Sequence, residues 1–177
     1  MWAANGALAI TFGTKLRSTF ILSRKDVCER SHPLIPAGIK TVNALEVSQR
    51  STDAWNKHDA DALVAVYAEG GTYHNPRLDH PLTGQAIGDF AKSVWAAYPD
   101  MSLEIISRGD TGGGLVAVQW VLRGTHTGPF MDGTAPTGRT VAYPGASFTQ
   151  VEGDKIRSEH TYLDRQTVAE QLGLKAK

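Results

Sequence analysis

The order of helix-like and strand-like segments predicts an α+β fold, in which N-terminal helices pack on a strongly curved antiparallel sheet. Between residues 41 and 98, three segments carry apolar residues at helical spacing. Between residues 101 and 164, four segments have the pattern of strands and are separated by glycine-rich turns or loops. Helices followed by a meander of strands are typical of α+β domains, and helices across the open face of such a sheet would enclose a pocket.

The first two helices are predicted near the start of this region. The first is indicated by residues that recur at helical spacing, namely Leu45, Ser48, Thr52 and Trp55. The second is short and covers residues 62–67, with Asp59 or Asp61 as its N-cap. Gly70 and Gly71 are expected to end this second helix.

A third helix is predicted over residues 84–98, because Ile87, Phe90, Val94 and other apolar residues lie on one face. Thr83 is its expected N-cap, and Pro99 stops it. The predicted strands and the last helical turn follow at residues 101–108, 115–127, 140–150, 155–164 and 167–172.

The composition fits a single globular domain. The chain has 177 residues, of which 41% are hydrophobic and 20% are charged. Its net charge of zero argues against binding to nucleic acid or to an anionic membrane surface. No apolar run is long enough to span a membrane, and the sole cysteine, Cys28, fits a reducing compartment. We therefore expect a cytoplasmic protein.

Residues 1–40 differ from the rest and are predicted to be an irregular or disordered leader, with the folded domain covering residues 41–177. The leader carries basic residues and no acid up to Lys25, and no periodic pattern persists in it. Its apolar stretch precedes the basic residues, whereas a secretory signal has the opposite order. A transit-like leader and a disordered extension both remain open.

The last predicted strand carries the most chemistry. Glu152-Gly153-Asp154 is expected to close a hairpin that starts this strand. Strict alternation then places five residues on the face that we expect to point inward: Ile156, Ser158, His160, Tyr162 and Asp164. The opposite face would carry Arg157, Glu159 and Thr161. An imidazole, a phenol and a carboxylate on an inward face are typical of an active site.

Five short motifs in this order resemble those of the SnoaL-like polyketide cyclase (ester cyclase) family over roughly residues 45–174. They are Ala97-Tyr-Pro-Asp100, Gly124-Thr-His-Thr-Gly128, Ala135-Pro-Thr-Gly-Arg139, Gly153-Asp-Lys-Ile156, and Tyr162-Leu-Asp164 with Gln171-Leu-Gly173. The resemblance implies a cone-shaped α+β barrel with a cofactor-free active site inside the cone. It also implies a homodimer or higher homo-oligomer packed through the sheet. The position of His160 departs from the pattern, because many relatives have Trp there.

The resemblance further implies ring closure by intramolecular aldol condensation on a small hydrophobic substrate, with Asp164 as acid/base. Such chemistry needs a base for the proton α to a carbonyl and an acid for the new alkoxide. His160, roughly 13 Å away along the strand, is expected to assist by contacting the substrate. The alternatives are that Asp164 only caps the last helix and that His160 is a core histidine.

Further aromatic and imidazole side chains are candidates for contacting the substrate. They are Trp55, His74, Trp95, Trp120, His126, Phe130 and Tyr162. A purely structural role remains open for these side chains. No compact metal-binding spacing connects the histidines and acids, so we expect no metal site.

Two other classes of function remain open at the level of sequence. An isomerase, dehydratase or epoxide hydrolase could use a buried carboxylate on the same fold. A non-catalytic protein that binds a small molecule could use the same pocket without chemistry.

Overall fold

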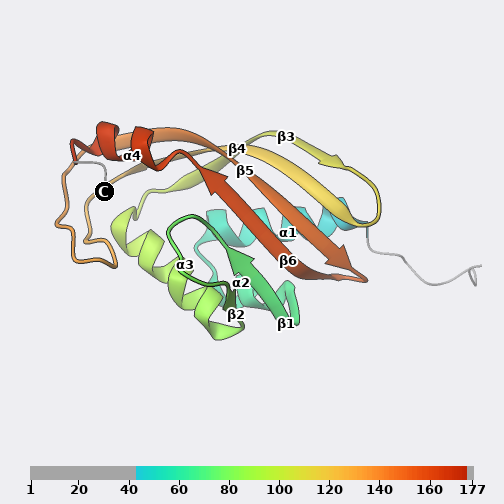
Figure 1. The fold of residues 1–177 in the computed structure, drawn as a ribbon. Helices are drawn as coiled ribbons and strands as arrows, with labels where there is room; N and C mark the ends of the chain where they lie inside the picture. Colours follow the sequence, from blue (N-terminus) through green and yellow to red (C-terminus); the bar gives the residue numbers. More distant parts are fainter. Residues whose placement is uncertain (1–42, 175–177) are drawn as a thin grey trace, which may run out of the picture. The chain divides into compact units, whose positions relative to one another are not determined.

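Three helices cover one face of a curved sheet in the computed structural model, which describes residues 43–174 (Figure 1). They are α1 (Ala44–Lys57), α2 (Ala60–Ala65) and α3 (Gln85–Ala97). The side chain of Asn43 caps α1, and that of Asp59, rather than Asp61, caps α2. The predicted leader lies outside the described residues.

The sheet has six strands in the order β2-β1-β6-β5-β4-β3. Their bounds are β1 (Tyr67–His74), β2 (Leu82–Thr83), β3 (Ser102–Asp110), β4 (Leu115–Thr125), β5 (Thr140–Glu152) and β6 (Lys155–Leu163). The predicted meander from β3 to β6 is antiparallel, whereas β1 pairs with β6 in parallel. The α+β class and the curved sheet are confirmed, and within residues 43–174 the sheet stays unclosed, with β2 and β3 as its edges.

Two predicted helix boundaries are wrong. Gly70 and Gly71 do not end α2 but lie within β1. A Cβ on Gly71 would stand 2.7 Å from the carbonyl oxygen of Ile156, so glycine is needed here for β1 to approach β6. Thr83 belongs to β2, and Gly84 is the N-cap of α3, with a positive φ of 52° that glycine adopts readily.

The core lies between the helices and the concave face of the sheet. Its fully buried members include Val47, Leu63, Ile87, Val116 and Ile156. A last helix, α4 (Arg165–Leu172), packs against β5 and matches the helical turn predicted near the end of the chain. None of the helices within residues 43–174 is long and apolar enough to cross a membrane.

A β-bulge in β6 decides which side chains face the helices. Val151 pairs with Ile156 but Gln150 pairs with Ser158, so Arg157 is an extra residue in the strand. Beyond the bulge the alternation is reversed. The predicted inward face is therefore wrong after Ile156: the buried residues are Glu159 and Thr161, whereas His160 and Tyr162 are exposed on the other face.

Candidate active site

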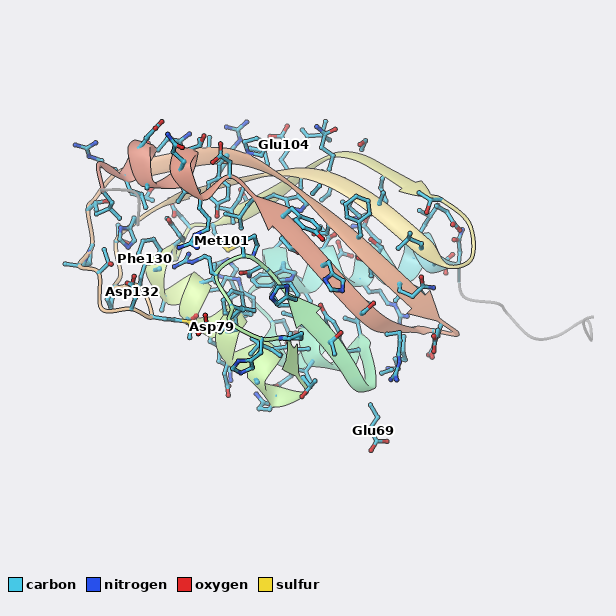
Figure 2. All side chains as sticks on the ribbon, viewed as in Figure 1. Glu69, Asp79, Met101, Glu104, Phe130 and Asp132 are labelled. Carbon is cyan, nitrogen blue, oxygen red and sulfur yellow. The ribbon has the colours of Figure 1, made fainter. Side chains whose placement is uncertain are left out.

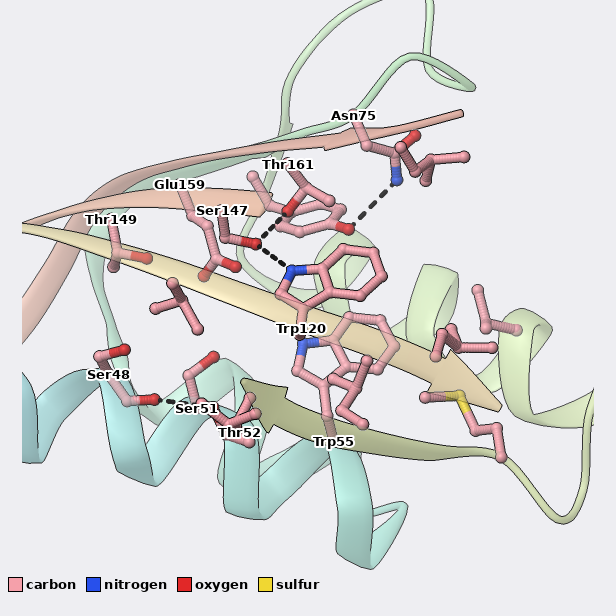
Figure 3. Close-up of a pocket in the computed structure, with 18 of the residues that line it drawn as sticks. Ser48, Ser51, Thr52, Trp55, Asn75, Trp120, Ser147, Thr149, Glu159 and Thr161 are labelled. Atoms are coloured by element: carbon pink, nitrogen blue, oxygen red, sulfur yellow. Dashed lines mark hydrogen bonds between the residues drawn. The ribbon is translucent and has the colours of Figure 1, made fainter. Parts of the chain in front are cut away.

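An inner cavity of about 80 Å³ lies between the helices and the concave face of the sheet. Residues of α1 face residues of β4, β5 and β6 across it (Figure 3). Its wall is largely apolar and aromatic, with contributions from Trp55, Tyr73, Phe90, Val118 and Trp120. Among residues 43–174, one carboxyl group, that of Glu159, belongs to this wall.

Glu159 is a buried acid with one strong hydrogen-bond donor. Its side chain is 7% exposed, and its Oε2 accepts a hydrogen bond from the hydroxyl of Tyr67 at 2.9 Å. Burial raises the pKa of Glu159, while hydrogen bonds from Tyr67 and Ser147 partly oppose this increase. A carboxyl group with a raised pKa in an apolar cavity is suited to both accepting and returning a proton.

A chain of neutral polar groups holds the wall next to Glu159. The indole N–H of Trp120 donates to the hydroxyl of Ser147 at 3.1 Å, and the hydroxyls of Ser147 and Thr161 lie 2.9 Å apart (Figure 3). Trp120 and Gly145 are partners across β4 and β5, and the ring occupies the space where a side chain on Gly145 would lie. The position of Trp120 is therefore closely fixed.

A second, outer cavity of about 490 Å³ adjoins the first. The two share three lining residues, Arg77, Tyr143 and Leu163, which form their junction. The outer cavity is otherwise lined by α4 and by the loop that joins β4 to β5, on which Phe130 and Asp132 lie (Figure 2). Only this outer cavity falls within the 300–1,000 Å³ typical of drug-sized ligands.

Three of the predicted substrate-binding residues line a cavity. Trp55 and Trp120 line the inner cavity, and Phe130 lines the outer one. Trp95 is buried outside the wall, with its ring 5.6 Å from that of Trp55 in a T-shaped contact and stacked on His58.

The predicted histidines and Tyr162 lie outside the cavity walls. His126 is fully buried and stacks on Phe130 at 4.0 Å, and burial lowers its pKa. His74 is half-buried, with Nε2 3.2 Å from the carbonyl oxygen of Leu78 and its ring 6.0 Å from that of His160. Tyr162 is 56% exposed on the convex face of the sheet. Their substrate-binding roles stay predictions.

Asp164 lies at the N-terminus of α4, exposed and outside both cavity walls. Its carboxylate accepts hydrogen bonds from the backbone N–H groups of Gln166 and Thr167 and from the hydroxyl of Thr167. The hydrogen bonds from Thr167 lower the pKa of Asp164. The capping alternative is confirmed, while the catalytic roles of Asp164 and the exposed His160 stay predictions.

Sequence reasoning missed Glu159, Tyr67 and Arg77 as site residues. Glu159 was placed on the opposite face because no local sequence signal marks the bulge at Arg157. Arg77 lies in a polar loop, where charged residues are ordinary. Within residues 43–174 no three His, Cys, Asp or Glu side chains lie close enough together to hold a metal ion.

The family model for SnoaL-like polyketide cyclases matches residues 45–172, which is more than half of the chain. The chain belongs to the SnoaL-like polyketide cyclase family. No curated protein matches this chain in sequence. Solved structures share its fold, and many of them are described as proposed polyketide cyclases.

Three solved structures illustrate the likeness. IdmH from Streptomyces antibioticus, proposed to be a polyketide cyclase, is 27% identical with a TM-score of 0.65, over 75% of this chain and 100% of that one. A protein from Jannaschia sp. CCS1, proposed to be a SnoaL-like polyketide cyclase, is 18% identical with a TM-score of 0.66, over 75% and 93%. AclR from Streptomyces galilaeus, proposed to be a hydroxylase, is 20% identical with a TM-score of 0.64, over 73% and 80%.

Proposed function

We propose that this protein is an enzyme that closes a ring by cofactor-free intramolecular aldol condensation, with Glu159 as its general acid/base. The observation that carries the proposal is the carboxyl group of Glu159, which is buried in the wall of the apolar inner cavity. The substrate class, a hydrophobic polyketide-like molecule, is supported by the family and by the aromatic wall.

One carboxyl group can carry both proton transfers of this reaction. The ionised Glu159 takes the proton from a carbon α to a carbonyl group, and the resulting enolate attacks a second carbonyl carbon of the same molecule. A carbon–carbon bond forms and the second oxygen becomes an alkoxide. Glu159 then returns its proton to this alkoxide, which regenerates the ionised carboxylate.

The sizes of the two cavities limit how the substrate binds. The inner cavity, at about 80 Å³, takes the reacting part of a polyketide but not a whole ring system. The outer cavity, at about 490 Å³, has room for the remainder. The substrate therefore extends across the junction, with its reacting carbon toward Glu159.

Ring closure of an anthraquinone-type polyketide ester, followed spectroscopically, tests this function with two matched variants. Glu159→Gln should lose about a hundredfold or more of turnover, as removal of a general acid/base does. Asp164→Asn, folded equally well, should retain most of it. If Asp164→Asn loses turnover and Glu159→Gln does not, the result would instead support the acid/base role that the family resemblance gives to Asp164. Binding of the ester without turnover by the wild type would favour a non-catalytic binding protein.

We also propose that the protein forms a homo-oligomer through the convex face of the sheet. Phe148 and Tyr162 are 43% and 56% exposed there, and their rings lie 6.0 Å apart. Neighbouring exposed aromatic rings favour an interface.

Light scattering should give a multiple of the chain mass for the wild type and a lower mass for Phe148→Arg. The control Met131→Arg, which changes an exposed residue in a loop, should behave like the wild type. A monomeric wild type would contradict the proposal.

A further inference from the structure

The hydroxyl of Tyr98 is a buried polar group without a hydrogen-bond partner in the described part of the chain. Tyr98 is 1% exposed and lines the inner cavity, and nothing within residues 43–174 hydrogen-bonds to its oxygen. Buried hydroxyls nearly always have a partner, so each exception calls for an explanation. A ligand oxygen in the cavity would supply the partner.

Arg77 lies at the junction of the two cavities and is held there by its surroundings. Its backbone N–H donates to Oδ1 of the buried Asn75 at 2.8 Å. Its guanidinium carbon lies 4.6 Å from the centre of the Phe130 ring, and Phe130 is itself stacked on the fully buried His126. No ion pair to Arg77 is found in the described part of the chain, so this exposed guanidinium is available to a ligand.

The positive charge of Arg77 is close enough to Tyr98 to affect the pKa of its hydroxyl. Burial raises the pKa of Tyr98 to about 12, and the positive charge of Arg77 opposes that increase. Arg77 opposes the raised pKa of Tyr143 in the same way. The three side chains therefore form one polar end of the inner cavity.

Among residues 43–174, the charged residues that line the outer cavity are Arg77, Arg165 and Asp132, and their charges sum to one positive charge. Arg165 donates to the carbonyl oxygen of Pro76 at 3.3 Å, and Asp132 accepts from the backbone N–H of Thr134 at 3.0 Å. A group with a single negative charge matches this set better than a doubly charged phosphate does.

Glu159 lies far from this polar end. It pairs with Thr149 of β5, whereas Tyr143 lies six residues earlier on the same strand, about 20 Å along it. A group bound at Arg77 therefore does not react directly with Glu159.

We propose that Arg77 and Tyr98 bind a carboxylate of an elongated substrate at the junction of the cavities, while the reacting carbon of that substrate faces Glu159. This inference rests on the proposed function, to which it adds a carboxylate group on the substrate. The planar guanidinium can donate two parallel hydrogen bonds to a carboxylate, and the phenol can donate another. The carboxylate thereby sets the depth to which the substrate enters the inner cavity.

Binding of biphenyl-4-carboxylate and of the uncharged biphenyl-4-carboxamide, followed by quenching of tryptophan fluorescence, tests the proposal. The wild type should bind the carboxylate about five- to tenfold more tightly. Arg77→Gln should remove this preference while leaving the affinity for the amide unchanged. The control Arg123→Gln should keep it, because Arg123 is ion-paired with Glu104 and lines neither cavity.

A second variant separates ligand binding from a structural role of Tyr98. Tyr98→Phe should weaken binding of the carboxylate about three- to tenfold, yet leave the urea midpoint of the unliganded protein unchanged or higher, because it removes an unsatisfied buried hydroxyl. A lower midpoint with unchanged binding would overturn the role of Tyr98.

Equal affinities of the wild type for the two compounds, or an undiminished preference in Arg77→Gln, would overturn the carboxylate site alone. If neither compound binds, both the hydrophobic pocket and the carboxylate site fail. If Glu159→Gln turns over the polyketide ester normally while the Arg77-dependent preference is present, only the acid/base assignment fails. The two proposals can therefore be rejected separately.

Discussion

The hydroxyl of Tyr67, the first residue of β1, donates a 2.9 Å hydrogen bond to the carboxyl group of Glu159 on β6. Both side chains are buried, and the strands that carry them are the parallel pair of the sheet. The bond satisfies one carboxyl oxygen without supplying a positive charge. Glu159 is thereby held in place while its pKa stays raised by burial.

Replacing Tyr67 by phenylalanine should raise the pKa of Glu159 further, because the hydrogen bond from Tyr67 lowers it. The acidic limb of the kcat/KM profile, which reports ionisation of the base, should therefore move to higher pH. Loss of this hydrogen bond to a buried carboxyl group should also cost about 1–3 kcal/mol of stability. A limb that stays in place, or moves to lower pH, would argue against this role of Tyr67. Tyr162→Phe is the control, because that residue lines neither cavity.

The stability of the wild type relative to Glu159→Gln should fall as the pH rises. Below the ordinary pKa of 4.5, Glu159 is protonated in the folded and the unfolded chain, so its ionisation costs nothing. Above 4.5 the unfolded chain releases the proton first, and stability falls by up to about 1.4 kcal/mol per pH unit. The loss is complete once the pH exceeds the raised pKa of the folded state.

Urea unfolding of the wild type and Glu159→Gln from pH 4 to pH 8 measures this difference. A relative stability of the wild type that is flat or rises with pH would show that Glu159 does not have a raised pKa.

A methyl group on Gly145 should displace the ring of Trp120 from the wall of the inner cavity, because the added Cβ would overlap that ring. Gly145→Ala should therefore cost about 1–3 kcal/mol and change the tryptophan emission. Gly109→Ala is the matched control in a strand, since a Cβ there has no neighbour within 4 Å. Equal stability of the two variants in urea unfolding would contradict the close packing of Trp120.

Much of the fold could be predicted from the sequence, because local patterns determine it. The inner stripe of the first helix, the Gly153-Asp154 turn and the positions of the strands in the second half lie close to where they were expected. The parallel partner of β6 could not be predicted. Its glycines, Gly70 and Gly71, look like a helix end. Gly70 has a positive φ of 68°, and Gly71 is explained by its contact with Ile156.

The site was harder to predict because one extra residue in β6 changes which of its side chains face the helices. Without the bulge at Arg157, His160 would face the helices and Glu159 would face outward. The bulge arises where β5 pairs with β6, and no turn-forming residue in the sequence indicates its position. The cap formed by Asp164 was predictable as an alternative, since its spacing to the last helix is local.

The most direct test of the central claim is exchange of the proton α to the carbonyl group of a polyketide ester for deuterium, followed by NMR in heavy water. The account predicts that the wild type catalyses this exchange and that Glu159→Gln slows it about a hundredfold or more, with Asp164→Asn close to the wild type. Exchange that survives in Glu159→Gln and is lost in Asp164→Asn would contradict the account, since the base would then be the exposed helix cap rather than the buried carboxyl group.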